Sequence, residues 1–106
     1  MCNATAIEIA NERQEMYAIF GKSRLEAERM DEIKEMATSM VIPMAKGQAG
    51  HVATYLSHNA DNTRGASIFV FETKEQAEAF SASMNLPPEA PVHIESFEVF
   101  EVFANG

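Results

Sequence analysis

Four segments of the chain have the alternating or continuous apolar pattern that favours β-strands, and we expect strands over residues 16–20, 51–58, 66–72 and 92–103. In the first and third segments apolar residues occupy both faces, which predicts central strands covered on both sides. In the last segment the apolar residues change phase between Ile94 and Phe97. A β-bulge near Ser96 would explain this change, and so would apolar cover on both faces of the strand.

The first of two predicted helices follows a capping-box pattern at Ser23 and Glu26, in which the serine hydroxyl would satisfy a free backbone amide. Behind this pattern an apolar stripe recurs at steps of three and four residues. Its members are Met30, Ile33, Ala37, Met40 and Met44. Pro43 lacks an amide hydrogen, so the helix should end or kink near Ile42.

The second helix is predicted from a capping box at Thr73 and Gln76, and Pro87 stops it. The order β-α-β-β-α-β indicates an α+β, ferredoxin-like fold, with a four-stranded antiparallel sheet and two helices on one face. Two helices cover only one face of a sheet, yet three of the strands carry large apolar side chains on both faces. We therefore predict a homodimer in which two sheets pack face to face.

Composition and charge narrow the classes of partner. The chain has 106 residues and a formal net charge of −8, from 16 acidic and 8 basic side chains. We expect an N-terminal tail over residues 1–15 and one domain over residues 16–106. The acidic balance argues against a nucleic-acid partner, and no apolar run reaches the roughly 20 residues that span a membrane. With no visible export signal and Cys2 as the single cysteine, a cytoplasmic location without an intramolecular disulfide is expected.

Histidine is the usual side chain for proton transfer near neutral pH. His51 opens the second predicted strand beside a glycine-rich turn, and strict alternation puts Tyr55 on the same face. We expect this pair to be the catalytic residues. The same alternation points His58 to the opposite face, where we interpret it as part of a hydrated hairpin tip. No recognised ligand spacing is present, so no metal site is expected.

Four further side chains are candidates for lining a ligand pocket. Tyr17 combines an apolar ring with a hydroxyl that could orient a phenolic substrate. Met40 and Met44 belong to a methionine-rich stripe that would make a deformable wall for a flat apolar ligand, with Phe69 on the third strand. The same side chains can also be ordinary core, and both interpretations stay open. No P-loop, dinucleotide fingerprint, zinc or nucleophile-elbow motif is present, so no cofactor is expected.

Three stretches carry a resemblance to a known family: YAIF at residues 17–20, FVFETKEQA at residues 69–77 and FEVFEV at residues 97–102. Over residues 16–104 the chain resembles the dimeric α+β barrel superfamily, and within it the antibiotic-biosynthesis-monooxygenase-like (ABM) domains. The resemblance implies a dimeric α/β barrel with a small apolar pocket between sheet and helices in each subunit. It implies a cofactor-independent monooxygenase, or an isomerase, acting on a small aromatic or quinone-like molecule. The alternative is a non-catalytic dimer that binds a small ligand or is purely structural.

Overall fold

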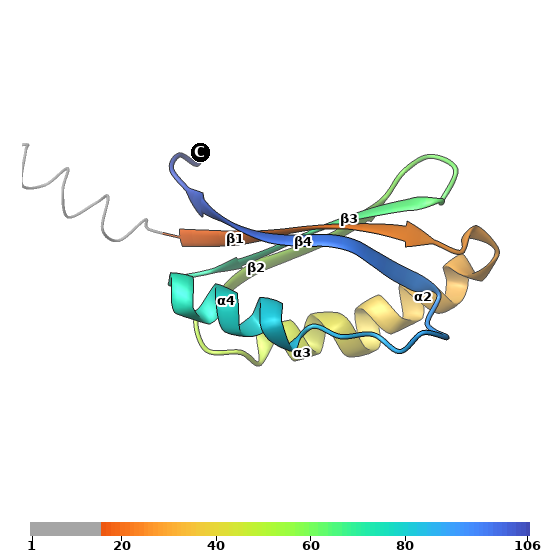
Figure 1. Ribbon diagram of the computed structural model, residues 1–106, viewed down its shortest axis with the longest axis horizontal. Coiled ribbons are helices and arrows are strands. Elements are labelled where there is room, and N and C mark those ends of the chain that lie inside the picture. The colour runs from red at the N-terminus through yellow and green to blue at the C-terminus, as the bar shows by residue number, and fades with distance from the viewer. Residues whose placement is uncertain (1–15) are drawn as a thin grey trace, which may run out of the picture.

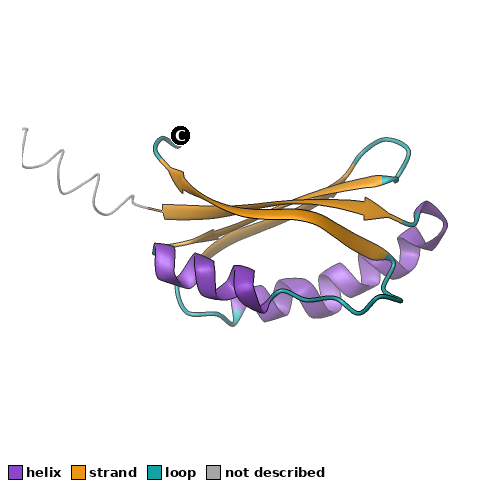
Figure 2. Ribbon diagram, viewed as in Figure 1, coloured by secondary structure: helices purple, strands orange, loops and turns teal. Residues whose placement is uncertain are grey.

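A computed structural model of the protein describes residues 16–106, and the predicted tail with Cys2 lies outside the described residues. The elements are β1 (Met16–Leu25), η1 (Ala27–Arg29), α2 (Met30–Met36), η2 (Ala37–Val41), α3 (Ile42–Lys46), β2 (His51–His58), β3 (Arg64–Phe71), α4 (Lys74–Ser83) and β4 (Val92–Val102). The strands form one antiparallel sheet in the order β2-β3-β1-β4. Figures 1 and 2 show that the helices lie against one face of this sheet. The predicted α+β, ferredoxin-like fold is confirmed.

The first strand is longer than the pattern predicted, and this removes the predicted start of the first helix. β1 continues to Leu25, because Ser23 pairs with Gly65 of β3 on one side and with Ile94 of β4 on the other. A strand bonded on both sides satisfies its backbone groups in the two ladders, which outweighs the local capping preference of a serine. The predicted capping box at Ser23 is therefore wrong, and a 3₁₀ turn begins after Glu26 instead.

The first helix continues past Pro43. α2 passes into the π-helical turn η2 and then into α3, which reaches Lys46. In a regular α-helix the proline ring collides with the carbonyl group four residues earlier, which belongs to Ser39. The wider π turn directly before the proline accommodates that ring, and the Ser39 hydroxyl donates to the backbone oxygen of Glu35 at 2.6 Å. The proline therefore changes the winding of this helix and does not end it.

The second helix begins as the sequence predicted. Thr73 Oγ1 accepts a hydrogen bond from the backbone N–H of Gln76, and Gln76 Oε1 accepts one from the backbone N–H of Thr73, both at 3.1 Å. This reciprocal pair is a complete capping box. α4 ends at Ser83 and Met84 is extended. From there the chain returns to β4 without further helix, so α4 covers only one end of the sheet (Figure 1).

Two β-bulges decide which side chains face the helices. In β4 the pairing with β1 skips Glu95, between Ile94 and Ser96, and this confirms the predicted bulge. In β2 the pairing with β3 shifts between His51 and Ala53, a bulge that the alternation of the sequence did not reveal. Each extra residue reverses the face of the side chains beyond it.

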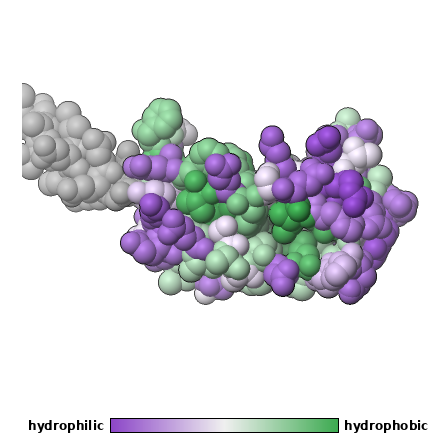
Figure 3. Space-filling view, in the orientation of Figure 1, coloured by the Kyte–Doolittle hydropathy of each residue, from purple (hydrophilic) through white to green (hydrophobic). Residues whose placement is uncertain are grey.

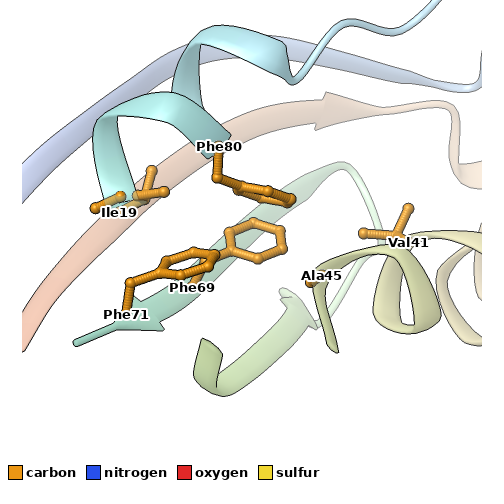
Figure 4. Packing of buried hydrophobic residues seen from close by; sticks show 7 residues of the cluster. Ile19, Val41, Ala45, Phe69, Phe71 and Phe80 are labelled. Carbon is orange, nitrogen blue, oxygen red and sulfur yellow. The ribbon is translucent and has the colours of Figure 1, made fainter. Parts of the chain in front are cut away.

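The larger core cluster fills the end of the sheet that lies under α4. Its buried members are Ile19, Val41, Ala45, Phe69, Phe71, Ala77 and Phe80. Figure 4 shows Phe69 and Phe71 of β3 next to Phe80 of α4, with ring centroids 4.9 and 5.3 Å from that of Phe80. Aromatic pairs at this separation stabilise the core beyond the area they bury. At this end of the molecule, large buried side chains fill the space between the sheet and α4.

The face of the sheet turned away from the helices, here the outer face, carries apolar side chains from all four strands. The register sets Phe20 of β1, Ile68 of β3 and Tyr55 of β2 side by side. Phe100 of β4 packs edge-on against Phe20, with ring centroids 5.2 Å apart. Phe20, Tyr55 and Phe100 are 44%, 64% and 45% exposed. The predicted sheet with apolar side chains on both faces is therefore confirmed.

Candidate functional site

A cavity of about 150 Å³ lies between the sheet and the first helix. Its mostly apolar lining comes from the ends of β1 and β2, the starts of β3 and β4, and α2 and η2. Met84 and Leu86, which follow α4, complete it, and no residue of α4 takes part. Figure 3 shows hydrophobic surface between the strand layer and the helix layer on one side of the molecule. An apolar cavity of this volume holds a benzene-sized molecule, so the space suits one aromatic ring.

Small side chains in one part of the sheet make the floor of the cavity. Ser23 of β1 pairs with Gly65 of β3, and Ser67 lies two residues further along β3 on the same face. Toward the other end of these strands Ile19 pairs with Phe69, and large side chains fill the space under α4. The change from large to small residues along one register therefore opens the cavity. The small residues 65–67, inside an otherwise apolar strand, are the sequence signal that could have located it.

Flexible methionines and the π turn make the opposite wall. Met30 and Met36 of α2 and Met84 line the cavity, and Ala37 and Val41 at the two ends of η2 complete this wall. Methionine side chains adapt to irregular shapes, so this wall can adjust to a ligand. π turns within α-helices recur at functional sites. The irregular winding of the first helix thus coincides with the cavity.

Of the four residues predicted to line a pocket, Phe69 lines this cavity and the other three do not. Met40 and Met44 are 48% and 41% exposed on the helix. Met40 and Met44 point outward because the π turn contains one extra residue. After it the buried positions of the helix are Val41 and Ala45. Tyr17 packs against the larger core cluster instead.

The bulge in β2 separates the two predicted catalytic residues. His51 pairs with Phe71, its Nε2 lies 2.7 Å from Thr54 Oγ1, and its ring packs edge-on against Phe71 with a centroid distance of 5.8 Å. Tyr55 pairs with Ile68 on the outer face. The expectation that His51 and Tyr55 share one face is wrong, because the bulge adds a residue between them. Neither lines the cavity, and their catalytic role stays a prediction.

Two ionisable side chains line the cavity: Lys34 of α2, which the sequence pattern did not single out, and His58 at the end of β2. The prediction that His58 points to the face opposite His51 is wrong, because the bulge in β2 brings both to the face that carries Phe71 and Gly65. Lys34 and His58 are exposed, so they lie at the mouth of the cavity. His58 Nδ1 is 3.0 Å from the backbone oxygen of Asn59. A carbonyl oxygen only accepts, so Nδ1 carries the proton and the neutral ring keeps Nε2 as an acceptor. His58 shares a face with Leu56 in the alternation, which is the signal that could have found it.

A polar cluster ties the start of the first helix to the start of β4, next to the cavity. The Glu26 carboxylate accepts hydrogen bonds from His93 Nε2 at 2.8 Å and from Arg29 Nη1 at 3.4 Å. Arg29 also pairs with Glu32 and donates to the backbone oxygen of Glu89. The hydrogen bond from His93, together with the Arg29 guanidinium, holds the pKa of the Glu26 carboxyl below its ordinary value.

Few ionisable side chains line the cavity. Its lining contains no Asp, Glu, Cys or Tyr. Over residues 16–106, no group of three or more His, Cys, Asp or Glu side chains is arranged to hold a metal ion. In the same part of the chain, no helix has the length and apolar character to cross a membrane. Acid-base chemistry in the cavity therefore falls to Lys34 and His58.

Three solved structures have a similar architecture. A putative antibiotic biosynthesis monooxygenase from Nitrosomonas europaea is 22% identical over 64% of this chain and 65% of its own, just under two thirds, with a TM-score of 0.54. A protein of unknown function from Nitrosomonas europaea is 15% identical over 89% of this chain and 95% of its own, with a TM-score of 0.62. A monooxygenase from Streptomyces coelicolor, in complex with nanaomycin D, is 15% identical over 93% of this chain and 95% of its own, with a TM-score of 0.51.

No protein-family model and no curated protein sequence matches the chain. At these identities the structural likeness shows the fold, which is that of antibiotic-biosynthesis-monooxygenase structures. The resemblance seen in the sequence is confirmed at that level. What the cavity binds and what chemistry it performs have to be argued from its own residues.

Proposed function

We propose that the protein is a homodimeric, cofactor-independent monooxygenase that acts on a one-ring phenol or quinol bound in the cavity. The observation that carries this proposal is an apolar, ring-sized cavity with a histidine acceptor, His58, at its mouth. The likeness to two structures described as monooxygenases, one of them holding nanaomycin D, favours the same class of reaction.

Binding would come from burial of the ring. The floor residues around Ser67 are small and the wall residues Met30, Met36 and Met84 are deformable, so a flat ring can enter without moving the backbone. Covering an aromatic ring on both sides is worth about 2–3 kcal/mol by apolar area alone. A few polar atoms at the mouth then orient the ligand.

The chemistry starts with removal of a proton from a phenolic hydroxyl. His58 Nε2 accepts that proton, and the resulting phenolate donates electrons to dioxygen. One oxygen atom forms a bond to a ring carbon, whose C–H bond breaks as the carbon becomes a carbonyl, and the other oxygen atom leaves as water. A quinol thus becomes a hydroxyquinone. The ring supplies all four electrons, so no separate reductant is consumed.

The test measures oxygen uptake and product mass with a panel of one-ring quinols. We expect one dioxygen per quinol, no hydrogen peroxide, and one atom from labelled dioxygen in the product. Ala37→Phe, which fills the cavity, and His58→Gln should each lower the rate at least tenfold, a typical lower range for loss of a general base. Met40→Phe, on the exposed side of the same helix, is the matched control for Ala37→Phe and should keep the wild-type rate.

Two results would contradict the proposal. One is the absence of oxygen uptake with every quinol of the panel. The other is a loss of rate in His51→Ala or Tyr55→Phe while His58→Gln keeps the wild-type rate, since this would return the catalytic role to the pair predicted from the sequence.

A second function, ligand binding without catalysis, is favoured by one specific observation. The lining holds no carboxylate, thiol or phenol, so Lys34 and His58 are its only side chains that can carry out proton transfer. This alternative predicts that one-ring phenols bind in the cavity and leave unchanged, without oxygen uptake.

The homodimer is part of the proposal. The outer face carries the apolar side chains of Phe20, Tyr55, Ile68 and Phe100 from all four strands, with Glu98 opposite Phe20, while the helices of residues 16–106 lie on the other side (Figure 2). Monomeric proteins rarely expose a contiguous apolar area larger than a few hundred Å². A second copy packed on the same face would cover it symmetrically.

A further inference from the structure

We propose that the ligand is a hydroxylated one-ring aromatic carboxylate, and that Lys34 binds its carboxylate group at the mouth of the cavity. The inference rests on the proposed function, in that it takes the cavity as the ligand site. It adds the charge of the ligand and the residue that recognises that charge.

The distribution of charge around the cavity is the first observation. Acidic side chains outnumber basic ones by 16 to 8 in the chain, yet the lining contains a lysine and a histidine and no acidic residue. A hollow that adjoins the cavity, and shares His58 with it, is also lined by Arg64, which pairs with Glu95 at 3.9 Å, and by Lys22, which the register places on the outer face. The lining of the cavity therefore has positive and no negative side chains in an otherwise acidic protein, and this favours an anion at its mouth.

The state of Lys34 is the second observation. Some basic residues are paired: Arg29 with Glu26 and Glu32, Arg64 with Glu95, and Lys74 with Glu78. Over residues 16–106 the Lys34 ammonium takes part in no hydrogen bond or ion pair. A lysine at the edge of an apolar cavity lays its methylene chain along the wall and keeps its ammonium at the opening. That ammonium is free to bind the charged group of a ligand.

The two ionisable groups come from opposite walls, and this selects the kind of anion. Lys34 belongs to the helix wall, and His58 ends the outermost strand of the sheet wall. A ring in the cavity can direct a carboxylate to Lys34 and a phenolic hydroxyl to His58 Nε2. A benzene-sized cavity leaves the carboxylate outside the apolar space, where it keeps part of its hydration and pairs with the ammonium.

The experiment compares 4-hydroxyphenylacetate with the neutral 4-hydroxyphenylacetamide by titration calorimetry on the full chain. The two probes have the same ring, hydroxyl and shape and differ in charge. We expect the acid to bind about fivefold tighter, as for a partly exposed ion pair, and the preference to shrink at high salt. Lys34→Met keeps the apolar stem and should make the two affinities equal. Lys46→Met, the same change of charge on an exposed lysine outside the lining, should keep the preference.

The possible failures are distinguishable. Equal binding of acid and amide to the wild type overturns the charge inference and leaves the cavity as a ligand site. A preference for the acid that survives Lys34→Met overturns the role of Lys34. If neither probe binds, and Ala37→Phe leaves the rate of oxygen uptake with quinols unchanged, the cavity is not the ligand site. The proposed function then fails together with this inference.

Discussion

Replacing Phe20 by threonine should weaken self-association without unfolding the subunit. Phe20 lies on the outer face, where it pairs with Ile68 of β3 and packs edge-on against Phe100 of β4, and it is 44% exposed. Threonine is accepted in strands, so the sheet itself should persist. The change removes an apolar ring from the surface that we propose a second copy covers.

The magnitude follows from area. An aromatic side chain presents roughly 200 Å², so a ring 44% exposed leaves roughly 90 Å² for a partner to cover. At about 25 cal/mol per Å² this is worth about 2 kcal/mol per ring. A two-fold interface contains each residue twice, so Phe20→Thr should cost about 4 kcal/mol of association free energy. The dissociation constant should rise about a thousandfold.

Sedimentation equilibrium at micromolar concentration measures this constant directly. The wild type should sediment as a dimer and Phe20→Thr as a monomer with an unchanged circular dichroism spectrum. Met40→Gln is the matched control, because Met40 is 48% exposed on the helix side. A folded wild-type monomer at that concentration, or an equal effect of Met40→Gln, would refute the reasoning about the outer face.

Two further predictions concern stability. Gly50 has φ +79°, and a Cβ there would collide with the side chain of the capping Gln76. Gly50→Ala should therefore lower the free energy of unfolding, measured by urea titration, by about 2 kcal/mol. Gly47→Ala is the control: Gly47 has a helical φ of −78° and a Cβ there meets only ordinary contacts, so the free energy of unfolding should change by less than about 1 kcal/mol. Because the hydrogen bond from His93 lowers the pKa of Glu26 in the folded state, its stabilising contribution is present above the unfolded carboxyl pKa of about 4.3 and is lost as pH falls through the folded value. Glu26→Gln should therefore be less stable than the wild type at neutral pH and equal to it in acid, and a stability difference that does not change with pH would exclude this account.

Local sequence signals predicted much of the fold, and their failures have a physical pattern. The capping-box patterns at Thr73 and Ser23 look alike in sequence, yet only Thr73 caps a helix. Ser23 lies where two neighbouring strands can both bond to the backbone, and long-range pairing decides its conformation. A pattern within a few residues contains no information about those partners.

The candidate site was harder to predict because one extra residue in the first helix and one in β2 change which side chains face the space between helix and sheet. The π turn moves the inward positions from Met40 and Met44 to Val41 and Ala45. The bulge beside His51 does the same in β2. Regular periods of 3.6 and 2 residues assign the wrong face after such an insertion. The bulge near residue 95 was predictable because the apolar residues around it change phase.

Nuclear magnetic resonance of the protein labelled with ¹³C in its methionine methyl groups tests the central claim, that the cavity takes one aromatic ring, most directly. Met30, Met36 and Met84 line the cavity, whereas Met40 and Met44 lie on the same side of the sheet outside it. Titration with neutral 4-methylphenol should shift the first three methyl signals, through the ring current, and leave the other two in place. Shifts confined to Met40 and Met44, or no shift at saturating 4-methylphenol, would contradict the account.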